Sequence, residues 1–352
     1  MPSRFAWIAV LAAVGLAGCL PSSGKRQDTA LLPADSTSRV LAQAVAPDTL
    51  GAVWRVEAPT TDPLLLATTI AWVGDQLAVV DTQAGRARWI GADGAFQGGV
   101  AFGAEAFPYG AGVTGDTLGV LLRGADALVW LVPSDTLRPK EVHQVAVPPG
   151  TQAALVLGDS AVVRLGGGAT GAPAELAVVR ADGTLGERVA MPGAAWRSIG
   201  FVRKWGADVI ALSGYRPVVD RWRPGAAPDT LALSGFDSPQ LRRSAQFLRG
   251  DADEPPLLIP SAAPLADRLY VLNARADRLR VDVYGRDGRL LRVLVDPAPH
   301  APLDLVAVDL AVRQTDGATE IAVLWQRPRG VLRAGGSAIE LFRVPRADAG
   351  AR

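Results

Sequence analysis

The sequence predicts an all-β fold, and three observations lead to that class. A short apolar strand recurs six times along the chain, at spacings of 41, 43, 48, 60 and 52 residues. The segments between these strands contain turn residues and further short strands, and helical stretches are almost absent from them. The 38 glycines and 26 prolines in 352 residues fit frequent turns better than long helices. Repeats of this length with three or four strands each are typical of a six-bladed β-propeller of four-stranded antiparallel blades.

The repeated unit begins with a turn and an apolar strand, and a second strand follows after a gap. The apolar strands are anchored on Leu77, Leu118, Ala161, Val209, Leu269 and Ile321. Three of them follow a Gly-Asp pair, beginning at Gly74, Gly115 and Gly158. The second strand often ends in Asp-Gly, as at residues 93–94, 182–183 and 287–288. Asp-Gly is a strong hairpin signal, because glycine accepts the positive φ that tight turns require.

The last repeat lacks an outer strand, since the chain runs into a polar tail after residues 338–344. At the other end, residues 52–57 alternate between apolar and polar side chains but belong to no repeat. We therefore expect residues 52–57 to pair with the last blade and close the ring. Closure would cover edge strands that otherwise promote aggregation.

A pair of β-sandwiches is the structural alternative, but sandwich strands do not recur in blocks of four. Residues 50–345 resemble six-bladed propellers of the NHL-like superfamily in their blade pattern: an apolar strand, a second strand centred on an aromatic residue or valine, and an Asp-Gly turn. The usual signature of this superfamily is approached only at residues 77–81, Leu-Ala-Val-Val-Asp. The resemblance therefore implies the broad superfamily and no particular subfamily.

The N-terminus has the three parts of a secretory signal. Arg4 supplies a positive charge, residues 5–17 form an apolar run of 13 residues, and small residues precede Cys19. The run is shorter than the roughly 20 residues that a membrane-spanning helix needs. Residues 16–19, Leu-Ala-Gly-Cys, resemble the lipobox of bacterial lipoproteins. That resemblance implies cleavage before Cys19 and attachment of lipid, including fatty acyl chains such as palmitate, to its thiol; the alternative is an ordinary signal peptide with a chance cysteine.

Lipidation of Cys19 would explain the only cysteine of the chain, which has no disulfide partner. Leu20 follows it instead of aspartate, and by the same resemblance this favours the outer membrane over the inner membrane of a Gram-negative cell. The expected organisation is a signal peptide (1–18), a lipidated N-terminus with a flexible tether (19–47), the propeller (48–346) and a disordered tail (347–352). The 36 basic and 35 acidic residues nearly cancel, which argues against a nucleic-acid partner.

No residue pattern indicates a catalytic, cofactor-binding or metal site. Propeller lactonases resemble one another in holding a metal with carboxylate and asparagine ligands, but the only asparagine here, Asn273, is explained by its strand pattern. Histidine occurs twice: His143 is predicted on the solvent face of an outer strand, and His300 in a proline-rich connection. Residues 166–168 are three glycines without the lysine and helix of a phosphate-binding loop, and they are predicted to form a long hairpin.

The widest spacing between repeats contains an insertion, residues 236–256, which is the first candidate for a binding surface. A short helix is predicted in it, capped by Ser238 with Pro239 at its first position. The acidic residues after this helix are interpreted as a solvated turn; they are Asp251, Asp253 and Glu254. Tryptophans within the strand pattern are expected to fill the space between blades; they include Trp89, Trp130 and Trp222.

Two functions remain at the level of sequence. The first is a binding or assembly module in the bacterial cell envelope, anchored to the membrane through its N-terminal lipid, with a protein or small-molecule ligand on one face. The alternative is an enzyme centred on the propeller channel, such as a metal-dependent lactonase or another hydrolase. A polar cluster on the innermost strands would favour the enzyme. The innermost strands are predicted at residues 68–72, 199–203 and 306–310, and they are mostly apolar with isolated charges.

Overall fold

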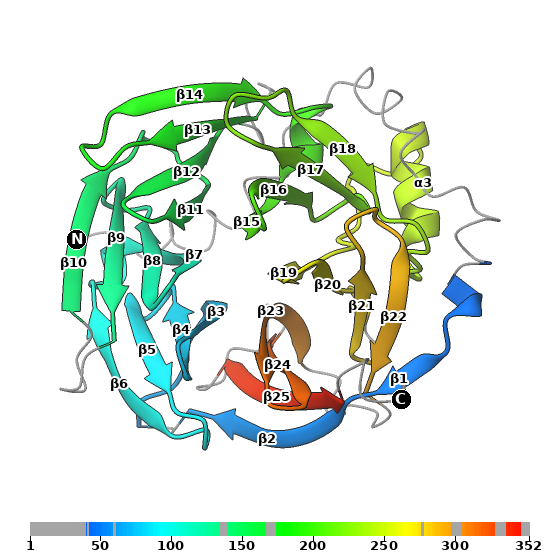
Figure 1. The fold of residues 1–352 in the computed structure, drawn as a ribbon, viewed down its shortest axis with the longest axis horizontal. Helices are drawn as coiled ribbons and strands as arrows, with labels where there is room; N and C mark the ends of the chain where they lie inside the picture. Colours follow the sequence, from blue (N-terminus) through cyan, green and yellow to red (C-terminus); the bar gives the residue numbers. More distant parts are fainter. Residues whose placement is uncertain are drawn as a thin grey trace, which may run out of the picture.

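The fold is a ring of six β-sheets, or blades, around a central axis, and each blade is built on four antiparallel strands (Figure 1). The computed structural model describes residues 40, 42–58, 61–133, 140–166, 174–275, 278–296, 305–327 and 336–345. The six-bladed β-propeller and its four-stranded blades are therefore as predicted. Among the described residues no helix is long and apolar enough to cross a membrane.

The first four blades are each formed by four strands that are consecutive in the chain. Blade 1 contains β3 (Ala67–Val73), β4 (Gln76–Asp81), β5 (Arg86–Ile90) and β6 (Phe96–Ala101). Blade 2 contains β7 (Pro108–Thr114), β8 (Thr117–Leu122), β9 (Ala127–Val132) and β10 (Lys140–Ala146). Blade 3 contains β11 (Ala153–Leu157), β12 (Ser160–Leu165), β13 (Glu175–Val179) and β14 (Leu185–Ala190). Blade 4 contains β15 (Gly200–Trp205), β16 (Asp208–Ser213), β17 (Val218–Trp222) and β18 (Asp229–Ala232).

The last two blades also use strands from the N-terminal segment. Blade 5 contains β19 (Ser261–Leu265), β20 (Arg268–Leu272), β21 (Arg280–Tyr284), β22 (Leu290–Val295) and, parallel to β22, β1 (Pro47–Thr49). Blade 6 contains β23 (Val306–Thr315), β24 (Ala318–Gln326), β25 (Ser337–Pro345) and, antiparallel to β25, β2 (Gly51–Glu57). The expected closure of the ring by residues 52–57 is confirmed. The fifth strand of blade 5 was not predicted.

A short helical stretch that includes residues 42–44 precedes β1, and the other helical elements lie in the connections between strands of the ring. Those in the connections are η3 (Ala104–Ala106), η5 (Ala195–Ser198) and α3 (Leu241–Arg249). The first strand of each blade surrounds the axis, and the fourth lies at the rim (Figure 1). The repeat detected in the sequence was anchored on the second strand of each blade, β4, β8, β12, β16, β20 and β24. This strand carries the clearest signal because both of its faces pack against neighbouring blades.

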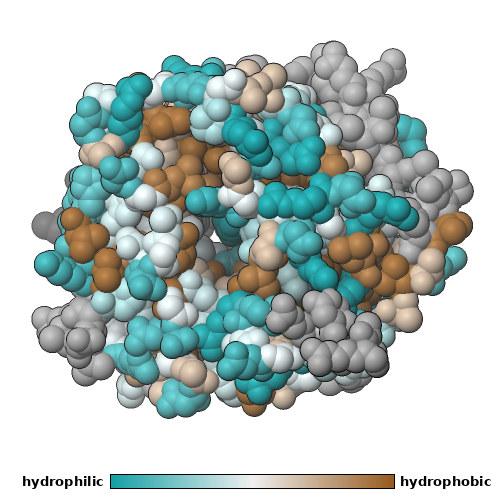
Figure 2. All heavy atoms as spheres, viewed as in Figure 1, coloured by the Kyte–Doolittle hydropathy of each residue, from teal (hydrophilic) through white to brown (hydrophobic). Residues whose placement is uncertain are grey.

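The hydrophobic core is divided among the interfaces between successive blades. Blades 2 and 3, for example, share a cluster that includes Trp130, Val156 and Val163. Trp89, Trp130 and Trp222 are all buried, which confirms that they fill space between sheets. On the face seen along the axis, hydrophilic residues cover much of the surface, apolar residues gather in patches, and the surface is hollowed near the centre of the ring (Figure 2).

The glycines that stand before three of the anchor strands have the conformation that hairpins require. Gly74, Gly115 and Gly158 have φ of 57°, 57° and 69°. Other residues rarely adopt such angles, so these glycines permit the tight turns between the first and second strands of blades 1, 2 and 3.

Candidate functional site

A polar cluster at the axis joins the innermost strands of four blades. Asp309 of β23 is buried, and its Oδ2 accepts a hydrogen bond from the backbone N–H of Ile70 in β3 at 2.8 Å. The hydroxyl of Ser261, at the start of β19, donates to Oδ1 of Asp309. The guanidinium of Arg203, in β15, lies 3.7 Å from the same oxygen. Since these residues come from blades 6, 1, 5 and 4, Asp309 connects most of the ring across its centre.

Arg203 and Asp309 form an ion pair that is largely removed from solvent. Burial raises the pKa of Asp309, and the charge of Arg203 and the hydrogen bond from Ser261 act in the opposite direction. Burial lowers the pKa of Arg203, and Asp309 opposes that shift. Both charged groups therefore lose hydration, and their mutual attraction offsets part of this desolvation free energy.

The charges on the innermost strands were predicted to be isolated, and this was wrong for Arg203 and Asp309. The polar cluster, whose presence would have favoured an enzyme, does exist. Its oxygens, however, already accept hydrogen bonds from Ser261 and Ile70, and a guanidinium lies beside them. A hard cation needs several open oxygen ligands, so this arrangement does not fit calcium or zinc. Among the residues that the structure describes, no group of three or more His, Cys, Asp or Glu side chains is placed to hold a metal ion.

The insertion, residues 236–256, contains α3 and packs closely on blade 4. Phe247 and Leu248 of this helix are buried together with Trp196, whose ring meets that of Phe247 edge-on at 5.0 Å. In Figure 1, α3 lies at the rim of the ring, in the connection between β18 of blade 4 and β19 of blade 5. The insertion is therefore part of the folded domain, and the side of α3 opposite to Phe247 is exposed to solvent.

The helix begins later than the sequence predicted. Its first residue is Leu241, not Pro239, and Ser238 lies in the turn that precedes it. The Oγ of Ser238 accepts a hydrogen bond from the N–H of Gln240 at 3.3 Å, and its carbonyl accepts one from Leu241 at 3.2 Å. Ser238 thus starts the turn, as expected of a serine before a helix, but the α-helical repeat begins three residues further on.

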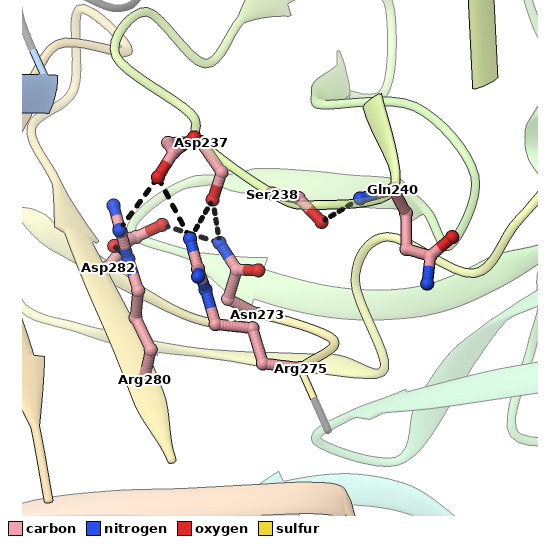
Figure 3. A network of polar contacts seen from close by, with 7 residues as sticks. All are labelled: Asp237, Ser238, Gln240, Asn273, Arg275, Arg280 and Asp282. Carbon is pink, nitrogen blue, oxygen red and sulfur yellow. Dashed lines mark hydrogen bonds and ion pairs between the residues drawn. The ribbon is translucent and has the colours of Figure 1, made fainter. Parts of the chain in front are cut away.

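A network of charged groups fixes the start of the insertion to blade 5 (Figure 3). Asp237 Oδ2 lies 2.9 Å from Arg275 Nη2 and 3.1 Å from Arg280 Nη1. Arg280 Nε also donates to Asp282 Oδ1 at 2.7 Å. Asn273 Nδ2 donates to the carbonyl of Asp237 at 2.7 Å and to Asp282 Oδ2 at 3.0 Å. Figure 3 shows these five side chains converging from the insertion and from the chain around β20 and β21.

This network is balanced, with two carboxylates facing two guanidinium groups. Burial raises the pKa of Asp282, which is fully buried, and Arg280 and Asn273 oppose the shift. Asn273 was predicted to be an ordinary strand residue, but it lies just after β20 and cross-links the insertion to blade 5. The one signal that pointed to it was that it is the only asparagine of the chain. The network acts as a structural clamp on the insertion, because its carboxylates are already neutralised.

The acidic residues after α3 lie in a turn, as interpreted from the sequence. Asp251, Asp253 and Glu254 are exposed, and Asp251 Oδ2 accepts a hydrogen bond from Arg249 Nε at 3.0 Å. Glu254 acts instead on Tyr215, whose pKa is raised by burial first and by the charge of Glu254 second. These carboxylates therefore interact with separate neighbours.

The remaining candidates are dispersed or lie outside the described residues. His143 is on the outer strand β10, as predicted, but its ring is half-buried and lies 4.9 Å from that of Trp130. It therefore packs on a tryptophan instead of pointing into solvent. Cys19 and His300 lie outside the part of the chain that the structure describes, and so do two of the three glycines at 166–168.

Comparison with known proteins identifies the fold alone. No protein-family model matches the sequence, and no curated protein matches it. Among solved structures, the chain resembles regucalcin from Agrobacterium tumefaciens, described as a calcium-binding protein, with 13% identity, a TM-score of 0.51, and coverage of 86% of this chain and 98% of that one. It also resembles a putative exported protein from Bacteroides fragilis, with 10% identity, a TM-score of 0.50, and coverage of 90% and 97%. These structural similarities support the six-bladed β-propeller fold and do not indicate an activity.

Proposed function

We propose that the protein is an exported lipoprotein whose propeller is a binding module of the cell envelope. The sequence up to Cys19 supports export and lipidation, and the tether predicted after it would hold the domain away from the membrane. Inserted elements on a rigid scaffold are where binding specificity commonly lies. We assign the binding surface to the insertion, residues 236–256.

The observation that carries this proposal is that the insertion is held firmly at both ends. At its start, Asp237 is clamped by Arg275 and Arg280. Beyond its end, the carbonyl of Gly214 accepts hydrogen bonds from Leu258 at 2.8 Å and from Ile259 at 3.0 Å. A surface that is already ordered loses little conformational entropy when a partner binds, and this favours affinity.

The displayed side of α3 is positively charged. Arg242 and Arg243 are exposed and make no ion pair with any described residue. Arginine is enriched in protein interfaces because its planar group forms paired hydrogen bonds with carboxylates. We therefore propose that the partner is a protein with an acidic surface, and that electrostatic attraction speeds its association.

Point substitutions test this surface better than removal of the insertion. A linker in place of residues 236–256 would strip Phe236, Phe247 and Leu248 from the core, so lost binding would be inseparable from unfolding. We expect Arg242→Glu to reduce capture of a partner from detergent-solubilised envelope membranes, with its melting temperature unchanged. The matched control is Arg188→Glu, an exposed arginine on blade 3. Equal capture by the two variants would contradict the assignment.

The lipid anchor has a separate test. We expect Cys19→Ser to move the protein from the membrane fraction to the soluble fraction, because acyl chains on the Cys19 thiol supply the membrane affinity. Mass spectrometry of the mature N-terminus should detect the added acyl groups in the wild type alone. An unmodified wild-type N-terminus would refute lipidation without affecting the proposed binding surface.

A further inference from the structure

The chain that leads into the ring is attached to it more weakly before Leu50 than after it. β1, which consists of Pro47, Asp48 and Thr49, is exposed along its whole length and pairs with β22 at three positions. Residues 42–46 before it are exposed or half-buried. Figure 1 shows β1 on the outside of the ring beside the end of β22, with the preceding chain leading away from the blades.

An exposed ion pair reinforces the pairing of β1 with blade 5. Asp48 Oδ2 accepts a hydrogen bond from Arg292 Nε at 2.8 Å, but 49% of the Asp48 side chain is exposed. Ion pairs in contact with solvent contribute little to stability. The two strands are also parallel, and parallel pairing is slightly less stable per residue than antiparallel pairing. Little free energy therefore holds residues 42–49 against the blade.

The attachment becomes firm at Leu50. Its side chain is 3% exposed, and its N–H donates to the carbonyl of Val295 at 2.8 Å. β2, which follows directly, is seven residues long and pairs antiparallel with β25. Trp54 Nε1 of β2 also donates to the carbonyl of Ala92 in blade 1 at 3.0 Å. Detachment beyond Leu50 would therefore break the closure of the ring, whereas detachment before it would leave the closure intact.

We propose that residues 42–49 are a releasable strap. The strap detaches from blade 5 while the ring stays folded, because segments with few buried contacts open locally at a free energy well below that of global unfolding. Leu50 sets the point at which detachment stops. A released chain spans at most ~3.3–3.6 Å per residue, so the strap adds up to roughly 25 Å of reach to the propeller.

The strap goes beyond the proposed binding surface and regulates how that surface is presented. Residues 42–49 follow the segment that leads from Cys19, so release lengthens the connection between the lipid and the ring. A pull on this connection acts on the strap before it acts on Leu50. This consequence for presentation rests on the proposed lipid anchor, whereas the release itself depends only on the contacts of β1.

Hydrogen exchange resolved to single amides tests the release. The full-length Cys19→Ser variant is used, so the result does not depend on lipidation. We expect the hydrogen-bonded amides of β1 to exchange about a hundredfold or more faster than those of β2, with little dependence on urea below the unfolding transition. Global unfolding exposes far more surface and depends steeply on urea. Equal protection and equal urea dependence of β1 and β2 would overturn the proposal.

A matched pair of substitutions tests the weak contact that holds the strap. Asp48→Ala removes the ion pair with Arg292 and should speed exchange of β1 roughly twofold to fivefold, as loss of an exposed ion pair implies. Asp229→Ala is the control, since Asp229 forms a similarly exposed ion pair with Arg221 in blade 4. It should leave exchange of β1 unchanged. Equal exchange of β1 in the two variants would count against the proposal.

A disulfide supplies the opposite perturbation. Thr49 and Val295 are paired in the ladder, so Thr49→Cys combined with Val295→Cys places two thiols on neighbouring strands, within bridging distance. In the Cys19→Ser background, oxidation should slow exchange of β1 to the rate of β2, and reduction should restore the fast rate. Optical tweezers that hold the two chain ends should record an early extension of roughly 1–2 nm in the reduced form alone. Absence of this extension in the reduced form would overturn the proposal.

Discussion

Leu50 lies where the N-terminal segment crosses from blade 5 to blade 6. It follows β1, which pairs with β22, and precedes β2, which pairs with β25. Its side chain is 3% exposed and packs in the cluster between these two blades. Its N–H donates to the carbonyl of Val295 at 2.8 Å. Loss of this side chain should therefore loosen the strands on both sides of it.

Leu50→Ala is the perturbation that measures this role. A buried leucine replaced by alanine loses transfer free energy and leaves a cavity, at a cost of about 2–5 kcal/mol. Because Leu50 sits on a chain segment near the N-terminus that can partly collapse, we expect a loss of about 3 kcal/mol in the free energy of unfolding. A whole domain is stable by only ~5–15 kcal/mol, so the effect is large.

Urea unfolding followed by tryptophan fluorescence provides the assay. We expect a lower midpoint with an unchanged slope, which would indicate lost stability and an unaltered extent of unfolding. Val53→Ala in β2 is the matched control, since Val53 is 43% exposed and should change stability by less than about 0.5 kcal/mol. If Leu50→Ala unfolds at the same urea midpoint as Val53→Ala, packing of Leu50 between blades 5 and 6 does not stabilise the ring.

Three further substitutions test other parts of the ring. Burial raises the folded-state pKa of Asp309, so the folded protein favours the protonated carboxyl. The resulting contribution to the free energy of unfolding is fully present below the unfolded pKa of about 4 and is lost as pH rises through the folded pKa. Urea unfolding at several pH values should therefore show the wild type losing stability relative to Asp309→Asn as pH rises from about 4, and a constant difference would contradict this. Phe247→Ala, at a fully buried position, should cost about 3 kcal/mol or more and expose the insertion to trypsin; resistance equal to that of the wild type would argue against tight docking of α3. Gly124→Ala should lower the melting temperature because its Cβ would clash with the Glu105 carbonyl, whereas an unchanged value would mean that the turn can shift.

Much of the fold was predictable because its signals are local. Alternation of apolar side chains and glycines at tight turns depend on neighbours in the sequence, so strands and hairpins could be located. The repeat then indicated the number of blades, and the unpaired stretch at residues 52–57 indicated how the ring closes, as β2 confirms. The hairpin glycines, such as Gly158, have the expected conformation.

The candidate sites were predictable only in part. The insertion was located from the irregular spacing, but its docking through Phe247 could not be inferred, because Trp196 lies in a separate repeat. Asn273 was assigned to its strand, and its role as a cross-link to Asp237 depends on the position of a distant segment. His143 was placed on the correct outer strand, but not against Trp130.

The sequence by itself determined an all-β propeller of six blades, its closure, and a lipidation motif at Cys19 that stays a prediction. Only the tertiary structure decided which charges meet. Arg203 and Asp309 were predicted to be isolated in their strands, yet the ring brings them within 3.7 Å at its axis. Arg123 likewise finds Tyr109 only when its turn folds over blade 2. Such contacts join segments from different strands and blades, and no local pattern encodes them, because ring geometry alone sets which side chains face each other.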